Sequence, residues 1–282
     1  MGKTVRYILY AVIIAICVMS VFIGVYSLIF RDYRDSNVMV GDNNTTGDNN
    51  VAKNQEDIKN EFENLFTNKF SKSNFDDSSI QKLDNTKELV YDGLQYSDAK
   101  ENLYEINVNI PFININSDVA NEFNSQTQKI FVNEADKLVK QTTSSVYTVF
   151  NVNYVAFINN NILSVGILGS IKEGNNPQRM LMQTYNYDLS TGKKVTINDI
   201  LNNRGMDSTV VNKQIYSIVS AAQANSDAME SSGYTVYKRD LKSDIYNVTN
   251  VQTFMQGPNG ELYIIYAYGN TKNTSEMDII KI

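Results

Sequence analysis

The hydrophobic and polar positions divide the chain into an apolar start, a polar interval and a long remainder with periodic patterns. Residues 7–30 carry no charge and read YILYAVIIAICVMSVFIGVYSLIF. About 24 residues at ~1.5 Å each span roughly 36 Å, which exceeds a hydrocarbon core of ~30 Å. We therefore predict that residues 1–34 form a transmembrane anchor with a short cytoplasmic tail, and that residues 7–30 cross the membrane.

A cleaved signal peptide and a buried core helix are the alternatives for this segment. The apolar run is longer than the ~7–15 residues of a signal peptide and ends without a small-residue cleavage site, so we favour a retained anchor. Two basic residues flank each end, which leaves the orientation open by charge alone. With about 250 residues after the run and few before it, we expect a single-pass membrane protein with a cytoplasmic N-terminus and an extracellular C-terminal domain.

Residues 35–55 are rich in Asn, Asp, Thr and Gly and contain little to bury, which predicts a flexible linker. Their oxygen-rich side chains could meet calcium, but the fixed acidic spacing of a calcium loop is missing. Residues 56–99 are expected to be a helical lead-in. Apolar residues recur there at three- and four-residue steps (Ile58, Phe62, Leu65, Phe66 and Phe70). Such a stripe could dock a partner helix, and we favour an ordinary core face.

The remainder alternates strand and helix patterns in two parts, residues 100–142 and 143–282, which we expect to form one compact unit. Strands are predicted at 104–110, 145–158, 162–172 and 179–189, helices at 117–141 and 207–230, and a hairpin with a terminal strand after residue 250. Ser117 or Asp118 is expected to cap the first helix, and Pro111 to end or edge its strand. The predicted fold class is α+β, with antiparallel β-sheets packed by amphipathic helices after one transmembrane helix.

The stretch YNYDLSTGKKVTINDIL, residues 185–201, reads as a hairpin followed by a short helical turn. Asp188 is expected to accept hydrogen bonds from the turn, and Gly192, between Thr191 and Lys193, to supply a left-handed conformation. Asp199 is expected to cap the following turn. We weigh this structural interpretation above a catalytic Asp188–Asp199 pair.

Composition excludes several classes of function. The chain has no histidine and one cysteine, Cys17, which lies in the apolar run. Histidine-dependent triads, thiolate zinc sites and disulfides are therefore excluded beyond the anchor. Of the 25 basic and 31 acidic residues, four basic and one acidic lie in the first 34, which leaves 21 and 30, a net charge of −9. This charge disfavours nucleic acid as a partner, and we expect no cofactor, no metal and no catalytic residue.

Two segments carry a resemblance to known families. YEINVNIPFININSDVANEFNSQTQKIF resembles the PdaC-type accessory domain of deacetylases. NILSVGILGSIKEGNNPQRMLMQTYNYDLSTGKKVTINDIL resembles the RsiV-like domain of unknown function, whose hallmark Asp-Leu-x-Thr-Gly-Lys falls here on Asp188, Leu189, Thr191, Gly192 and Lys193, followed by Asp199 and Ile200. Lys172 to Asn176 replace the glycine-rich, histidine-containing turn that family members often have, so a role for that turn does not carry over.

The resemblance implies an extracytoplasmic domain that senses or binds. RsiV-type proteins bind lysozyme outside the membrane, and PdaC-type domains accompany peptidoglycan deacetylases. We expect neither a sigma-binding bundle, for which the residues before the predicted anchor are too few, nor a deacetylase module, whose metal ligands include histidine. We expect a non-catalytic binding or sensing domain that recognises a lysozyme-like envelope protein or a cell-wall glycan. The alternative is a carboxylate-dependent cell-wall hydrolase or an accessory domain of cell-wall modification, and no pair of acids has a spacing that nominates it.

Overall fold

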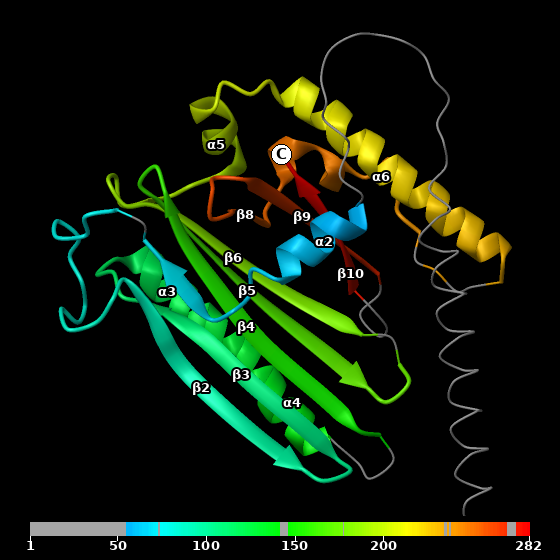
Figure 1. The fold of residues 1–282 in the computed structure, drawn as a ribbon, viewed down its shortest axis with the longest axis horizontal. Coiled ribbons are helices and arrows are strands. Elements are labelled where there is room, and N and C mark those ends of the chain that lie inside the picture. Colours follow the sequence, from blue (N-terminus) through cyan, green and yellow to red (C-terminus); the bar gives the residue numbers. More distant parts are fainter. Residues whose placement is uncertain are drawn as a thin grey trace, which may run out of the picture. The chain divides into compact units, whose positions relative to one another are not determined.

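A seven-stranded mixed sheet forms the centre of the fold in the computed structural model (Figure 1). Six of its strands are ordered β2-β3-β4-β5-β6-β7. The seventh strand, β1, pairs with β4 on the same side as β3. The bounds are β1 Lys69–Ser71, β2 Val90–Lys100, β3 Tyr104–Ile113, β4 Thr148–Asn159, β5 Ile162–Glu173, β6 Arg179–Asp188 and β7 Lys193–Lys194. The expected meander of three strands before residue 190 is confirmed.

The structure describes residues 55–72, 74–141, 146–176, 178–233, 236, 238–269 and 275–282. These residues belong to one compact unit, Ala52–Ile282. Within them, no helix is both long and apolar enough to cross a bilayer. The predicted anchor at 1–34 and nearly all of the predicted linker at 35–55 lie outside the described residues.

The sheet is mixed, where the sequence pattern favoured purely antiparallel sheets. Strand β3 pairs in parallel with β4, from Tyr104 opposite Thr148 to Val108 opposite Val152. Strand β1 also pairs in parallel with β4, whereas the β4–β5 and β5–β6 pairs are antiparallel. The parallel pair is possible because a long helical crossover joins β3 to β4.

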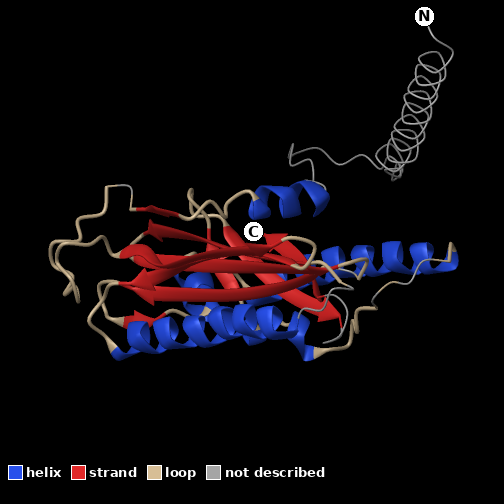
Figure 2. Cartoon of the chain, turned by 90° about the horizontal axis from the view of Figure 1, so that it is seen from below, coloured by secondary structure: helices blue, strands red, loops and turns tan. Residues whose placement is uncertain are grey.

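That crossover forms one layer on the back of the sheet in Figure 1 and below it in Figure 2. It consists of α3 Asp118–Thr127, a π-helical segment η1 Gln128–Val132 and α4 Asn133–Gln141. The Ser117 hydroxyl accepts a hydrogen bond from the Ala120 N–H, so Ser117 is the N-cap, one of the two expected candidates. Its apolar side chains, including Phe123, Phe131 and Leu138, join the main core with one set of alternate strand residues.

A second sheet of three strands and helix α2 lie on the opposite side (Figure 2). Their bounds are α2 Gln55–Glu63, β8 Phe254–Gln256, β9 Leu262–Gly269 and β10 Ser275–Lys281. Ile58, Phe62 and Phe66 pack with Val155 and Phe157 of β4, so the predicted apolar stripe is a core face. The helix is shorter than expected, because Phe70 belongs to β1 instead.

Asn186 connects the two sheets. It accepts a hydrogen bond from the Ser164 hydroxyl at 2.7 Å and donates one to the Phe254 carbonyl at 2.8 Å, and it is buried. A third apolar cluster lies around α5 Ile197–Asn203 and α6 Ser208–Ser231, with the short turns η2 Asp244–Tyr246 and η3 Val248–Asn250. In both views α6 extends beyond the sheets.

The structure differs from the sequence-based prediction at residues 90–100 and at Pro111. Residues 90–100 form a long strand, β2, so most of this strand replaces the end of the expected helical lead-in at 56–99. Strand β3 continues through Pro111, because the register of β2 shifts between Asp92 and Leu94, opposite this proline. Such a bulge tolerates a residue without an N–H donor.

Candidate binding face

The surface of the sheet opposite α3 and α4 is polar over β2, β3 and β4. In β3, Ile106, Val108 and Ile110 point into the helix-side core, so Asn107 and Asn109 point to the other side. The same alternation in β4 exposes Asn153 and leaves Asn151 half-buried on that side. We define the amide face by seven residues: Asn68, Gln95, Ser97, Asn107, Asn109, Asn151 and Asn153.

The amide face is organised by the register of the strands. Ser97 lies opposite Asn107, and Asn107 lies beside Asn151 in the parallel pair. The Ser97 hydroxyl donates to Asn107 Oδ1 at 2.7 Å, and Asn107 Nδ2 donates to Asn151 Oδ1 at 3.3 Å. Gln95 lies opposite Asn109 in the neighbouring row. Two rows of neutral polar side chains therefore cross the strands.

The sheet forks between β3 and β4. Their pairing ends at Val108 and Val152, and β1 takes the place beside β4 from Val155 onward. Asn68, at a φ of +54°, precedes β1 and closes the fork. Its N–H donates to the Tyr154 carbonyl at 2.8 Å, its Oδ1 accepts from the Tyr154 N–H at 3.0 Å, and its Nδ2 donates to Asn153 Oδ1 at 3.2 Å.

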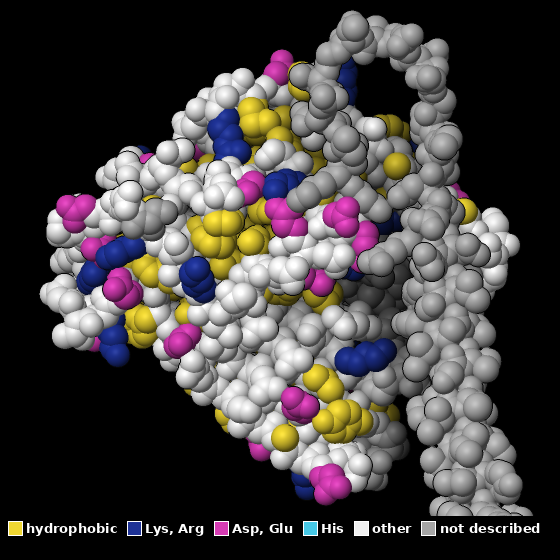
Figure 3. Space-filling model, viewed as in Figure 1, with side chains coloured by type: hydrophobic (Ala, Val, Ile, Leu, Met, Phe, Trp, Pro, Cys, Tyr) yellow, Lys and Arg dark blue, Asp and Glu magenta, His cyan; other side chains and the backbone are white. Residues whose placement is uncertain are grey.

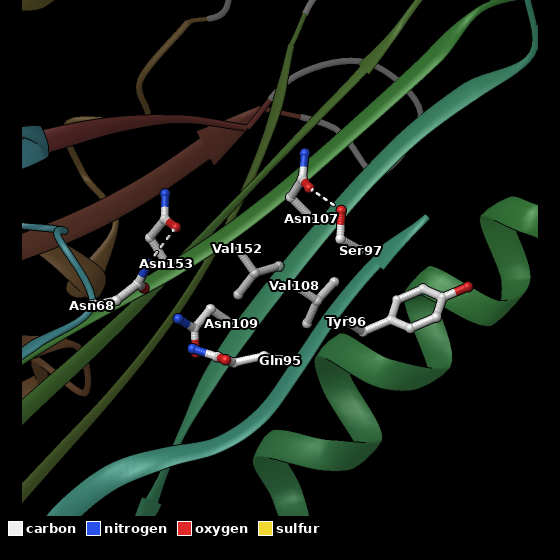
Figure 4. A pocket seen from close by; sticks show the side chains of 9 residues that line it. All are labelled: Asn68, Gln95, Tyr96, Ser97, Asn107, Val108, Asn109, Val152 and Asn153. Atoms are coloured by element: carbon white, nitrogen blue, oxygen red, sulfur yellow. Dashed lines mark hydrogen bonds between the residues drawn. The ribbon is translucent and has the colours of Figure 1, made fainter. Parts of the chain in front are cut away.

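A hollow of about 270 Å³ opens at this fork. Figure 4 shows the residues that line it: Asn68, Gln95, Tyr96, Ser97, Asn107, Val108, Asn109, Val152 and Asn153. Tyr96 points away from the amides toward a helix, and its hydroxyl donates to Asp98 at 3.2 Å. The amides of Gln95 and Asn109 lie together in the same view. The polar character of the hollow therefore comes from carboxamides and one serine.

One carboxamide oxygen in the hollow is unsatisfied. Asn109 Oδ1 is buried and accepts no hydrogen bond from the described residues. A buried acceptor without a partner costs about 1–3 kcal/mol. Its cross-strand neighbour Gln95 is exposed and donates from Nε2 to Asp92 at 2.9 Å. The Gln95 side chain lies beside Asn109 across the strand pair, so it is a neighbour of this oxygen in the hollow.

No residue that lines the hollow is charged. Figure 3 shows this region as mostly white, with isolated charged and hydrophobic side chains around it. The nearby carboxylate of Asp92 accepts from the Tyr154 hydroxyl at 2.7 Å as well as from Gln95. Burial and this carboxylate raise the pKa of Tyr154, so its hydroxyl stays protonated. The residues that line the hollow therefore present neutral donors and acceptors, and one carboxylate, that of Asp92, is bonded to Gln95 next to them.

The carboxylates of the described residues do not form a hydrolase-like pair across this hollow. Glu134 and Glu173 both lie against Arg179, at 3.9 and 3.1 Å. Asp77 and Glu88 share Lys72, each at 3.5 Å. In the described part of the chain, no group of three or more acidic or cysteine side chains is arranged to hold a metal ion.

The residues nominated from sequence lie in and after the β6–β7 hairpin. Asp188 Oδ1 accepts from the N–H groups of Ser190 and Thr191 at 2.8 and 3.1 Å, and Gly192 has a φ of +71°. Partial burial would raise the pKa of Asp188, but the bonds from Ser190 and Thr191 bring it below its ordinary value. Lys193 is exposed and begins β7 opposite Asp188.

Asp199 has a capping role different in detail from the predicted one. The N-cap is Thr196, and Asp199, three residues later, completes a capping box. Its carboxylate accepts from the Thr196 N–H and hydroxyl, both at 2.7 Å, and these bonds lower the pKa of Asp199. Both Asp188 and Asp199 are thus engaged in local turns, and neither lines the hollow.

The residues of the amide face were not singled out from sequence, although a signal exists. The tripeptide Asn-Val-Asn occurs at 107–109 and again at 151–153. In both copies the valine is buried and the asparagines point outward, and the copies pair in register. Outward amides repeated on two strands indicate a shared polar face once the pairing is known.

Comparison with known proteins gives limited information. No family model matches the chain, and no curated protein matches it. Among solved structures, it is similar to a DUF3298 family protein from Pseudomonas aeruginosa, with 9% identity and a TM-score of 0.33 over 68% of this chain and 89% of that chain. A DUF3298 member from Bacteroides fragilis shows 10% identity and a TM-score of 0.31 over the same shares. At these values the function has to be argued from the site.

Proposed function

We propose that this protein is a membrane-anchored, extracytoplasmic binding domain that recognises a cell-envelope ligand, a lysozyme-like protein or a cell-wall glycan, through the amide face. The observation that carries this proposal is the fork hollow, where neutral amides surround a buried, unpaired Asn109 oxygen. Binding sites are concave and use a few fixed polar groups for specificity. The anchor rests on the charge-free run at 7–30, and the extracellular orientation rests on the large part of the chain that follows this run.

Catalysis is not part of the proposal. A glycosidase of the two-carboxylate type needs acids about 5–9 Å apart across a groove. The hollow contains no carboxylate, and the two acidic clusters described above are bridged by Arg179 and Lys72. The candidate Asp188–Asp199 pair consists of two locally bonded capping residues.

A retention experiment tests the binding function. Immobilised residues 52–282 are exposed to a cell-envelope extract that contains both proteins and wall fragments, and retained material is measured. The double variant Asn109→Ala/Asn153→Ala should retain much less, whereas Asn225→Ala, an exposed asparagine on α6, should match the wild type. Equal retention by the wild type and the double variant would refute the amide face as the binding site.

The same protein should release no product from peptidoglycan or from chitin-like oligosaccharides, and a chelator should leave its melting temperature unchanged. Reproducible hydrolysis that is abolished by replacing one particular Asp or Glu would favour the carboxylate hydrolase instead. This assay measures turnover of a wall polymer, whereas the retention experiment measures binding alone.

A further inference from the structure

The register of the central sheet extends the two polar rows across five strands. The serine row consists of Ser97, Asn107, Asn151, Ser170 and Met180, one residue from each strand between β2 and β6. The fork row consists of Gln95, Asn109, Asn153, Leu168 and Met182. With strands ~4.8 Å apart, the serine row is about 19 Å long, whereas the fork row is interrupted between Asn109 and Asn153, where β3 and β4 separate.

Along each row the side chains change from polar to apolar. The β2 to β4 positions are polar, and the fork row ends in two half-buried apolar side chains, Leu168 and Met182. Both are packed against the cluster formed by α2 and the second sheet. We name Leu168, Met180 and Met182 the apolar shelf. A ligand that lies along the rows would meet neutral amides first and an apolar, polarisable surface next.

Given the proposed binding function, on which this inference rests, we infer that the amide face and the apolar shelf bind a neutral oligosaccharide that lies across the strands. A pyranose ring presents hydroxyl groups at its rim, each both donor and acceptor, and carbon-bound hydrogens on its faces. Carboxamides match the rim because each also offers donors and an acceptor. A sugar hydroxyl or amide N–H would supply the donor that Asn109 Oδ1 lacks.

The lack of charge in the hollow argues against other small ligands. Phosphates and carboxylates are recognised by Arg, Lys or helix N-termini, and none of these lines the hollow. Divalent cations of the magnesium and calcium type are bound in proteins mainly with the help of carboxylates, and the lining contains none. A neutral polyhydroxylated ligand is the class that this set of side chains fits.

An extended peptide is the main competitor, and the fork disfavours it. Peptides that add to a sheet bind through free backbone groups of an edge strand. At the fork, the Tyr154 N–H and carbonyl are both bonded to Asn68, at 3.0 and 2.8 Å. A ligand therefore meets side-chain amides rather than an open strand edge.

The apolar shelf predicts a preference among neutral glycans. An acetamido group carries a methyl group that can pack on Leu168 and Met182, while its N–H and carbonyl meet the amides. The trisaccharide tri-N-acetylchitotriose should therefore bind more tightly than cellotriose, which has the same backbone linkage without acetamido groups.

Isothermal titration calorimetry of residues 52–282 tests this inference with four probes: tri-N-acetylchitotriose, cellotriose, deacetylated chitotriose, which is cationic, and an uncharged glycine–serine hexapeptide. The neutral trisaccharides should bind, and Asn109→Ala should weaken binding about tenfold, which corresponds to the loss of about one hydrogen bond. Asn153→Ala, at an exposed position, provides a second variant in case Asn109→Ala lowers stability, and Asn225→Ala should change nothing.

Failure of both neutral trisaccharides to bind would overturn the inference, as would tighter binding of the hexapeptide or the cationic trisaccharide. Binding that is unchanged in both Asn109→Ala and Asn153→Ala would also overturn it, because the ligand would then lie elsewhere. If envelope material is retained through the amide face while neither trisaccharide binds, the proposed function stands and only the glycan assignment fails.

Discussion

At the scale of single residues, a well-buried ionic contact joins Arg239 to Asp278 of β10. The guanidinium donates to both carboxylate oxygens, at 2.7 and 2.8 Å, and the two side chains are 5% and 10% exposed. Arg239 also donates to the Ser226 hydroxyl at 2.9 Å, and its backbone N–H donates to Gln223 Oε1 at 2.6 Å. One arginine thus connects α6 with the last strand.

Asp278→Asn should lower the free energy of unfolding by about 3–5 kcal/mol, because it removes the charge of a carboxylate that accepts two hydrogen bonds from a buried guanidinium. Urea denaturation measures the change. Glu230→Gln provides the matched control: it removes the partner of Lys238 in an ion pair whose side chains are about half exposed, and it should cost less than about 1 kcal/mol. If both variants lost a similar amount of unfolding free energy, burial would not be the reason for the large contribution of the Arg239–Asp278 pair.

Gly192 has a conformational requirement at the same scale. Its φ of +71° is disfavoured for residues with a Cβ, and an added Cβ would lie 3.3 Å from the Tyr187 hydroxyl. Gly192→Ala should therefore destabilise the domain by about 1–2 kcal/mol in thermal or urea unfolding. Gly205→Ala separates backbone strain from the steric contact with Tyr187. Gly205 also has a positive φ, of +63°, but no atom lies within 4 Å of an added Cβ. A similar loss in both variants would assign the cost to backbone strain alone.

At the scale of elements, helix α5 is started by the reciprocal bonds of Thr196 and Asp199. The Asp199 carboxylate accepts from two Thr196 donors, and its negative charge lies in the first turn, where the helix dipole favours it. Ile197, Ile200 and Leu201 are the buried residues of α5. The residue at which the helix begins therefore also determines which side chains of α5 face the core. The capping box of Thr196 and Asp199 is therefore a local contact that also helps to position the buried side chains of α5.

The lowered pKa of Asp199 predicts a pH dependence. Because its folded pKa lies below the unfolded value of about 3.9, its stabilisation is complete above that value and is lost as the pH falls through the folded pKa. Asp199→Asn should be less stable than the wild type by about 1 kcal/mol at neutral pH, and this difference should shrink under acid. Urea unfolding of both proteins across this range measures it, and a difference that grows on acidification would contradict the assignment.

Elements with a local signal could be predicted from sequence, and pairings between distant segments could not. Ser117 and the period-two runs before residue 190 specify a cap and three strands through their own neighbours. Strand β2 was missed because most of its side chains are exposed and its alternation is weak. The parallel pairing of β3 with β4 depends on contacts more than 40 residues apart, and the amide face exists only through that pairing.

At the scale of the whole molecule, the domain follows a charge-free run that we expect to remain in the membrane. Protease added to intact cells or spheroplasts should digest residues 52–282, while the mature protein keeps its original N-terminus. N-terminal sequencing with and without membrane permeabilisation measures this. A soluble product that begins after residue 27 would show cleavage and refute the retained anchor.

Helix α2, the first described element, is fixed to the last strand of the domain. The Tyr263 hydroxyl donates to Glu61 Oε1 at 3.0 Å, and Lys281 also bonds to Glu61. The rings of Phe62 and Tyr263 lie 5.2 Å apart. A pulling force that enters from the N-terminal side therefore loads α2 first, and α2 is held by β9 and β10 through Glu61 and by β4 through Ile58 and Phe62. The mechanical resistance of the domain then depends on the contacts of α2, and Asn68 and β4 carry part of the same load to the amide face.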